Sequence, residues 1–374
     1  MTSFDLKLSP GVAASPTASR QHLTEAIKRL GFQRGRVIAT GVVLLLVAVW
    51  VSLSLGVGAL TPWQLCRALL APWLSPASLH DLSTTQINVL KNLRLPRSLM
   101  AVISGAALAM AGVAMQGITR NPLVSPYTLG ISPAAAFGAS LAILFGLNTL
   151  PGAGPYWTVG LAFASAMLCA LLVLGLASLR GVSSVVLVLA GVGLTYLFGA
   201  LTAAVQFVAS EQQLAAIVYW TFGSLNGRTW DEVLIAGSIC LLCVPVLLVH
   251  SGALNAFAAG GDDVAASLGV SVRRTRILVT LAAVLASAGV VSFTGVIGFI
   301  GLVAPHIGRL LIGGDHRLLL PFAGIVGALL VLTADMVGRL AFAPVMIPVG
   351  IVVAFLGVPL FLHLLLTRRH EMNV

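Results

Sequence analysis

The chain has 374 residues, of which 58% are hydrophobic and only 9% charged, and its mean hydropathy is +1.03. Such a chain has too little polar surface to cover itself in water, so the composition excludes an ordinary soluble domain and predicts a polytopic membrane protein. The formal net charge of +10 does not indicate nucleic acid as a partner, because the basic residues stand at the ends of apolar runs rather than in one patch with interleaved aromatic residues.

The chain begins with a polar stretch. Residues 1–35 predict an irregular cytoplasmic extension that ends in a basic cluster, made of Lys28, Arg29, Arg34 and Arg36. The apolar run over 37–60 is longer than the core of a signal peptide, which has about 7 to 15 residues. We therefore expect an uncleaved first span, a cytoplasmic N-terminus and one transmembrane domain over 36–370.

The second predicted span, over 98–118, is rich in glycine and alanine rather than leucine. Ala101, Gly105 and Ala109 recur at every fourth position, and Gly112 follows them. Small residues at this spacing allow the backbones of neighbouring helices to approach closely. We therefore predict that this helix lies inside a bundle.

Seven further apolar windows of membrane length follow. Between 277 and 312 the apolar character continues, but three glycines and Pro305 interrupt it, as a full span followed by a turn and a short span would require. With that short span the sequence predicts an all-α protein of about ten transmembrane helices. The nine full windows lie at 37–60, 98–118, 130–148, 156–179, 184–208, 233–250, 277–294, 318–341 and 347–367.

Lysine and arginine are distributed unevenly between the two predicted sides. With both termini in the cytoplasm, 15 of the 21 basic residues lie on the inner side and six on the outer side, in agreement with the positive-inside rule. Ten spans also divide into two sets of five. Because five is odd, the second set would insert upside down relative to the first, and we predict a five-plus-five inverted repeat.

Several motifs resemble those of one transporter family. In the first half they are Arg94-Leu-Pro-Arg97, Met115-Gln116-Gly117, Asn121-Pro122-Leu123 and Leu129-Gly130-Ile131-Ser132. In the second half they are Gly223-Ser224-Leu225 with Trp230, the run over 298–306 with Arg309, Asp335 with Arg339, and Pro348-Val349-Gly350 before Gly357-Val358-Pro359. Together they resemble the FecCD-type permeases from about Arg94 to Leu366, whereas residues 1–35 carry none of the resemblance.

The resemblance implies a function. FecCD-type permeases are the membrane subunits of ATP-driven bacterial importers for iron-siderophore chelates, haem and cobalamin. By resemblance, the chain would work in the bacterial inner membrane with a second permease copy or homologue, two cytoplasmic ATPases and a periplasmic substrate-binding protein. We expect an iron(III)-siderophore as cargo, with haem and then cobalamin as alternatives.

The chain carries no G-x-x-x-x-G-K-[ST] phosphate loop. ATP would therefore be used by the partner subunits, and we expect no cofactor, metal site or catalytic residue in this chain. The pair Cys240-x-x-Cys243 has no second pair and no nearby histidine, so we interpret these cysteines as small membrane residues.

Arg94, Arg97 and Arg339 stand at the predicted outer ends of spans, where the positive-inside bias makes arginine less expected. One interpretation is that each extends its guanidinium group to lipid phosphates. The resemblance instead implies that all three receive acidic side chains of the binding protein, and a guanidinium suits such bidentate pairing. Asp335 precedes Arg339 by four residues, so we expect it to orient or neutralise Arg339 rather than to carry protons.

The longest loop on the predicted inner side is the coupling segment, at about 252–276. Its residues Asp262, Asp263, Ala265, Ala266 and Gly269 indicate a short helix with an acidic start and a glycine stop. The alternative to a functional role is a surface helix at the lipid headgroups. The resemblance implies that this segment docks in a groove on each ATPase.

Four residues match the inner constriction of the family by resemblance, namely Asn121, Leu123, Ser183 and Ser184. By their chemistry alone, Asn121 before a proline would break a helix and Ser183 would start one, and both interpretations can hold together. At the opposite, outer mouth we expect residues 209–232, to which we assign no substrate contact.

Two other functional classes fit the sequence less well. A membrane enzyme should show metal or nucleophile spacing, but the chain has neither H-E-x-x-H nor G-x-S-x-G. A lone histidine such as His306 in an apolar span is more often packed than a ligand. An ion-coupled carrier would need charged or polar groups near the bilayer midplane, and the predicted spans are nearly empty of them.

Overall fold

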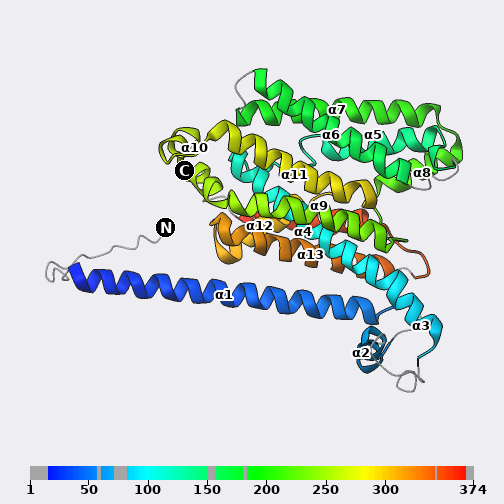
Figure 1. The fold of residues 1–374 in the computed structure, drawn as a ribbon, viewed down its shortest axis with the longest axis horizontal. Helices are drawn as coiled ribbons and strands as arrows, with labels where there is room; N and C mark the ends of the chain where they lie inside the picture. Colours follow the sequence, from blue (N-terminus) through cyan, green and yellow to red (C-terminus); the bar gives the residue numbers. More distant parts are fainter. Residues whose placement is uncertain are drawn as a thin grey trace. The chain divides into compact units, whose positions relative to one another are not determined.

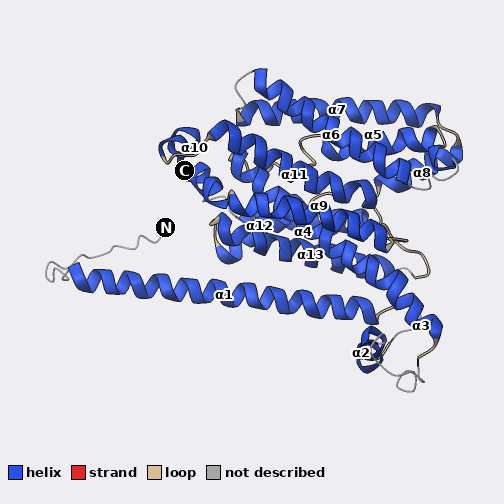
Figure 2. Ribbon diagram, viewed as in Figure 1, coloured by secondary structure: helices blue, strands red, loops and turns tan. Residues whose placement is uncertain are grey.

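The computed structural model describes residues 16–56, 60–70, 82–149, 156–179, 183–341 and 343–367. Every regular element in these ranges is a helix (Figure 2), which confirms the all-α prediction. The chain divides into two units, Met1–Thr40 and Gly41–Val374. The second unit contains both candidate sites.

The first helix, α1 (Pro16–Ser54), begins well before the predicted first span. The expectation of an irregular stretch over 1–35 is therefore wrong from Pro16 onwards. The residues that precede the apolar run are mostly good helix formers, including alanine, leucine, glutamine, glutamate, lysine and arginine. Because adding residues to an existing helix is far easier than nucleating one, the helix of the apolar run extends backwards through them.

Short elements follow α1. They are α2 (Pro62–Leu70), α3 (Thr84–Val89) and the π-helical turn η3 (Leu90–Arg94). Leu65 of α2 and Leu90 of η3 are fully buried together with Leu53 at the end of α1. This apolar cluster holds α2 and η3 against the end of α1.

Seven helices of the described chain are long and apolar enough to cross a membrane, and three shorter apolar helices accompany them. Together they agree with the ten predicted spans. The long ones are the membrane part of α1, α4 (Leu95–Thr119), α6 (Tyr156–Leu179), α7 (Ser184–Val208), α9 (Trp230–Val249), α11 (Val272–Thr294) and α13 (His316–Leu340). The shorter ones are α5 (Ile131–Leu144), α12 (Ile300–Ile312) and α14 (Val349–Thr367).

Three further short elements connect the spans. These are the 3-10 turn η4 (Leu147–Thr149), α8 (Glu211–Thr221) and α10 (Ser251–Ser267). Within the second unit, α4, α11 and α13 form the interior (Figure 1). The apolar windows of α4 and α11 are each 78% buried and that of α13 is 67% buried, whereas those of α6, α7 and α9 are at most 33% buried.

The interior is held by direct contact between helix backbones. A Cβ atom built on Gly105 of α4 would lie 2.2 Å from the carbonyl oxygen of Gly327 in α13, and one on Gly327 would lie 2.2 Å from that of Gly105. A Cβ on Gly112 would lie 2.1 Å from the carbonyl oxygen of Gly301 in α12. These contacts confirm the close approach predicted from the small residues of the second span.

The two sets of five spans share one irregularity. The third span of each set, α5 or α12, is short and follows an irregular stretch, 120–130 in the first set and 295–299 in the second. Both short helices start after a residue with a positive φ, 82° at Gly130 and 63° at Phe299. A pair of interrupted spans at corresponding positions is typical of an inverted repeat.

We expect Gly105→Ala to destabilise the protein, because the added methyl group must push the backbone of α13 away. The expected loss is about 2 kcal/mol, within the range for overpacked cores. The melting temperature in detergent should fall by about 4 °C. Gly175→Ala in α6, where nothing lies within 4 Å of the new Cβ, is the matched control, and equal melting of the two variants would contradict the packing argument.

Candidate functional site

The predicted site residues gather at the two ends of α4. Arg94 and Arg97 lie at its start, and Asn121 comes two residues after its end at Thr119. A helix of this length places the two ends about 37 Å apart at a rise of about 1.5 Å per residue. We call them the arginine end and the α10 end.

At the arginine end, one buried carboxylate holds two of the three predicted arginines. Asp335 accepts two hydrogen bonds from Nε of Arg97, at 2.9 Å and 3.2 Å, and Nη2 of Arg97 lies 2.9 Å from Oδ1. Nε of Arg339 lies 3.1 Å from Oδ2 of Asp335. The pairing of Asp335 with Arg339 was predicted from their spacing, whereas that with Arg97 was not, because 238 residues separate the two.

Arg94 and Arg339 also contact the last turn of α1. Nη1 of Arg94 donates to the carbonyl oxygen of Leu53 at 2.8 Å, and Arg94 is buried. Nη2 of Arg339 donates to the hydroxyl group of Ser52 at 2.9 Å. The cations therefore lie where a helix C-terminus favours positive charge and offers unpaired carbonyl groups.

The three guanidinium groups and the carboxylate carry a formal charge of +2. The side chains of Arg97 and Arg339 are each 12% exposed and that of Asp335 is 1% exposed. Arg97 is thus held in place but accessible, and it also lies 3.4 Å from the amide oxygen of Asn226. This cluster can attract an anionic partner, although Arg94 offers it little surface.

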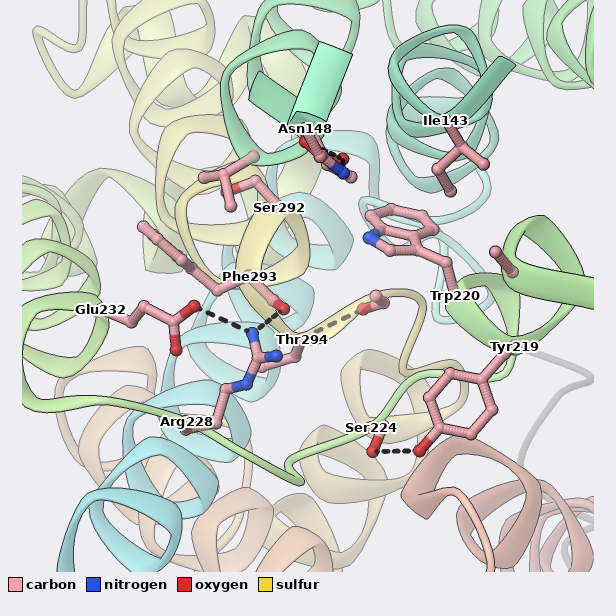
Figure 3. Close-up of a pocket in the computed structure, with 14 residues that line it drawn as sticks. Ile143, Asn148, Tyr219, Trp220, Ser224, Arg228, Glu232, Ser292, Phe293 and Thr294 are labelled. Atoms are coloured by element: carbon pink, nitrogen blue, oxygen red, sulfur yellow. Dashed lines mark hydrogen bonds and ion pairs between the residues drawn. The ribbon is translucent and has the colours of Figure 1, made fainter. Parts of the chain in front are cut away.

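A pocket of about 310 Å³ opens at the same end, in the region expected at the outer mouth. Arg228 lies between Glu232 and the backbone of Phe293 (Figure 3), with Nη1 3.4 Å from the glutamate and donating to the Phe293 carbonyl oxygen. The hydroxyl oxygens of Tyr219 and Ser224 lie 3.3 Å apart and form a hydrogen bond. Since the charges of Arg228 and Glu232 neutralise each other, the pocket presents hydroxyl and aromatic groups rather than a net charge.

At the α10 end, the predicted short helix of the coupling segment is the second half of α10. Gly260 and Gly261 have non-helical backbone angles and divide α10 into 251–259 and 262–267. Gly269 has a φ of +83° and donates to the carbonyl oxygen of Ala266 at 2.9 Å, as a C-terminal glycine stop requires. The first half, which the sequence did not indicate as a helix, extends the segment back to Ser251.

The residues predicted to meet an ATPase divide between two faces of this short helix. Ala265 is fully buried in the chain itself, so its contribution is to packing. Asp263, Ala266 and Gly269 are exposed, and Leu268 between them is 66% exposed. The surface that a partner can reach is therefore small, apolar and bordered by two exposed acids, Asp262 and Asp263.

The first half of α10 is tied to the start of α13. The Asn255 amide nitrogen donates to Asp315 at 2.7 Å, and the Asn255 amide oxygen accepts from the backbone nitrogen of His316 at 2.8 Å. Asp315 in turn caps α13 by accepting from the backbone nitrogen of Arg317. No local pattern points to Asn255, because its partners Asp315 and His316 lie 60 and 61 residues further along.

The second half of α10 is tied to the bundle by Arg276, which sequence reasoning did not single out. Its Nη1 and Nη2 lie 3.1 Å and 2.7 Å from the two carboxylate oxygens of Asp262. Nη2 also donates to the hydroxyl group of Ser184 at 3.0 Å. Only the position of Arg276 in the first turns of a span, seven residues after Gly269, could have drawn attention to it.

The four residues predicted to form the constriction lie at this same end. Asn121 accepts a hydrogen bond from the backbone nitrogen of Leu123 at 2.9 Å and shapes the turn after α4, and Leu123 is 49% exposed. Ser183 caps α7, while the Ser184 hydroxyl group donates to the carbonyl oxygen of Ile118 in α4 at 3.2 Å. The structural interpretation of Asn121 and Ser183 is thus confirmed, and their role in a constriction stays a prediction.

Comparison with known proteins adds to this geometry. A profile of the FecCD transport family matches residues 44–367. A protein of Methanocaldococcus jannaschii described as an ABC transporter permease is 43% identical over 285 residues, covering 74% of this chain and 81% of that protein. The hemin transport system permease of Yersinia pestis is 36% identical over 280 residues, covering 75% of this chain and 84% of that protein.

The fold is also similar to a solved structure, that of a metal-chelate type ABC transporter in an inward-facing conformation. The TM-score is 0.77 and the sequences are 32% identical. The match covers 89% of this chain and 99% of the solved one.

We expect Asp335→Asn to destabilise the arginine end, because it leaves two poorly exposed guanidinium groups without their shared counter-ion. Removing one partner of a buried ion pair costs about 3 kcal/mol or more. Asp231→Asn, at an exposed position in the first turn of α9 at the same end, should change stability by less than about 0.5 kcal/mol. Melting of both variants in detergent is the measurement, and equal stability would show that Asp335 does not hold the cluster.

Proposed function

Because the chain belongs to the FecCD transport family and is a membrane permease subunit of an ABC importer, we propose that it carries an iron(III)-siderophore into the cell. The observation that supports the class of cargo is the similarity to a transporter of metal chelates over nearly the whole chain. Haem is the alternative, since one relative is named for hemin, and cobalamin is the next.

The chain is a transport subunit and not an ATPase. In the proposal it binds no cofactor, and two cytoplasmic ATPases hydrolyse the ATP. A second copy of the chain or a homologue completes the pathway. The orientation is that of the positive-inside count, with both termini in the cytoplasm of a bacterial cell and the arginine end facing the periplasm.

The binding protein docks on the arginine end through carboxylates. The formal charge of +2 on the cluster supports this, because a carboxylate of the binding protein would bring the local charge closer to zero. Of the three arginines, Arg97 and Arg339 are the ones with exposed surface, and Arg94 acts by holding α1. The guanidinium groups of Arg97 and Arg339 each have five N–H donors. Each can therefore bind a carboxylate of the partner while it keeps its bond to Asp335.

The ATPases dock on the second half of α10. Ala266 in this helix and Leu268 and Gly269 directly after it are exposed and offer a small apolar surface that suits a groove. The hydrogen bond from Asn255 to Asp315 at the start of α13 fixes the position of the segment. Asn121, Leu123, Ser183 and Ser184 form the inner constriction beside it. These groups are uncharged, so they neither trap nor repel a bulky hydrophilic cargo.

We expect uptake of an iron(III)-siderophore by proteoliposomes only when the ATPases and the loaded binding protein are both present. The purified permease complex is reconstituted into proteoliposomes with ATP either inside or outside the vesicles, and with or without the binding protein. Uptake of ⁵⁵Fe-siderophore, haem and cobalamin is then measured in parallel. Uptake should persist with a proton ionophore and stop without ATP. Import by the chain alone would refute the class of mechanism, and import of haem but not of the siderophore would replace the cargo.

We expect Arg97→Gln to weaken docking of the binding protein by about tenfold at low salt, which corresponds to about 1.4 kcal/mol. The difference from the parent protein should shrink as salt is raised, because charges near the surface are screened. Lys91→Gln, which removes a basic residue at the same end outside the cluster, is the matched control. Binding measured by surface plasmon resonance that is equal for both variants would refute the docking role.

A further inference from the structure

We propose that Arg276 is a positioning residue that makes the second half of α10 move as one body with the adjoining ends of α4 and α7. The inference rests on the proposed function, in which the ATPases push on α10 and the constriction lies beside these helix ends. Arg276 is then the residue that transmits a movement of α10 to the helix ends beside the constriction.

One guanidinium group connects three elements that are far apart in the sequence. On one side it holds the carboxylate of Asp262 with two nitrogens, at 3.1 Å and 2.7 Å. On the other side its Nη2 donates to Ser184 at the start of α7, at 3.0 Å, and to the carbonyl oxygen of Ile118 near the end of α4, at 3.4 Å. The Ser184 hydroxyl group donates to the same carbonyl oxygen, so the two helix ends are also joined to each other.

The burial of Arg276 makes this connection stiff. Its side chain is 2% exposed, whereas that of Asp262 is 47% exposed. The guanidinium group also lies 5.5 Å from the ring centroid of Phe257, in the first half of α10. If α10 moved away alone, the buried guanidinium group would lose the carboxylate of Asp262, which is strongly unfavourable for a charge removed from water. A displacement of α10 is therefore expected to carry Arg276 and its other partners with it.

A second contact leads to the same helix end. Gly261, at the bend in α10, has a φ of +82°, and a Cβ built on it would lie 2.6 Å from Nη1 of Arg120. Arg120 ends α4 with a φ of 51° and directly precedes Asn121 of the predicted constriction. The bend at Gly260 and Gly261 lets the second half of α10 turn relative to the first, while Arg276 keeps it against α4.

The test compares variants that cut the connection on either side of Arg276. Asp262→Asn removes the ion pair with α10 and Ser184→Ala removes the hydrogen bond to α7, both in the complete complex in proteoliposomes. Arg276→Lys keeps the positive charge but loses the planar guanidinium group that binds both oxygens of Asp262. Arg317→Gln, which removes an exposed arginine at the same end, is the control. The quantity measured is the amount of cargo imported per ATP hydrolysed.

We expect Asp262→Asn to lower the amount of cargo imported per ATP by about fivefold while ATP hydrolysis continues. The ratio for Arg276→Lys should lie between those of the parent and Asp262→Asn. The double variant with Ser184→Ala should be no worse than Asp262→Asn alone, because both act through one guanidinium group. Arg317→Gln should match the parent. Full additivity of the two substitutions, or an unchanged ratio in both, would overturn the proposal.

A distance measurement separates transmission from a merely structural role. Spin labels at Ser267→Cys in α10 and Val185→Cys in α7, in a background without the native cysteines, report the separation of the two elements. In the parent protein the separation should stay constant when ATP binds, and in Asp262→Asn it should change by several ångströms. A change in the parent as large as in the variant would overturn the inference, whereas absence of ATP-driven import in the parent would refute the proposed function and the inference with it.

Discussion

The backbone contacts of α4 are the constraint on which the rest of the structure depends. In the interior of a membrane bundle, burying apolar side chains gives little gain over lipid, so helices are held by close packing and by the polar groups that packing brings together. Gly105 against Gly327 and Gly112 against Gly301 bring α4 to α13 and α12 without side chains between them. Because α4 carries Arg97 at one end and Arg120 at the other, its position in the bundle also sets the position of both candidate sites.

At each end of α4, one buried charged group is shared by several elements. At the arginine end a buried carboxylate, Asp335, is shared by two arginines from different spans. At the α10 end a buried arginine, Arg276, is shared by a carboxylate and two helix ends. In both places an isolated charge would be very costly in the interior, so the elements that supply the partners are bound to stay together. The difference lies in exposure, since Arg97 and Arg339 retain surface for a partner, whereas Arg276 is covered and can act only within the chain.

Much of the architecture could be predicted because the signals are local. The windows at 156–179 and 184–208 coincide with α6 and α7, since twenty apolar residues in a row have few alternatives to a membrane helix. The spacing of Asp335 and Arg339 likewise predicted their contact, because residues four apart share a helix face. The expectation for residues 16–35 failed for the opposite reason. A polar stretch has no strong pattern of its own, and its helix follows from the span to which it is attached.

The sequence by itself determined the class of protein, the approximate number of spans, the close packing of the second span and some of the residues at its two ends, among them Asp335 with Arg339. Composition, hydropathy and short spacings carry that information along the chain. Only the tertiary structure decided that Asp335 also holds Arg97, that Arg94 binds the end of α1, that Ala265 faces inward, and that Arg276 joins Asp262 to Ser184. These contacts join residues whose separation along the chain reaches 238 positions, so no local pattern encodes them, and they exist only because the helices are packed in one arrangement.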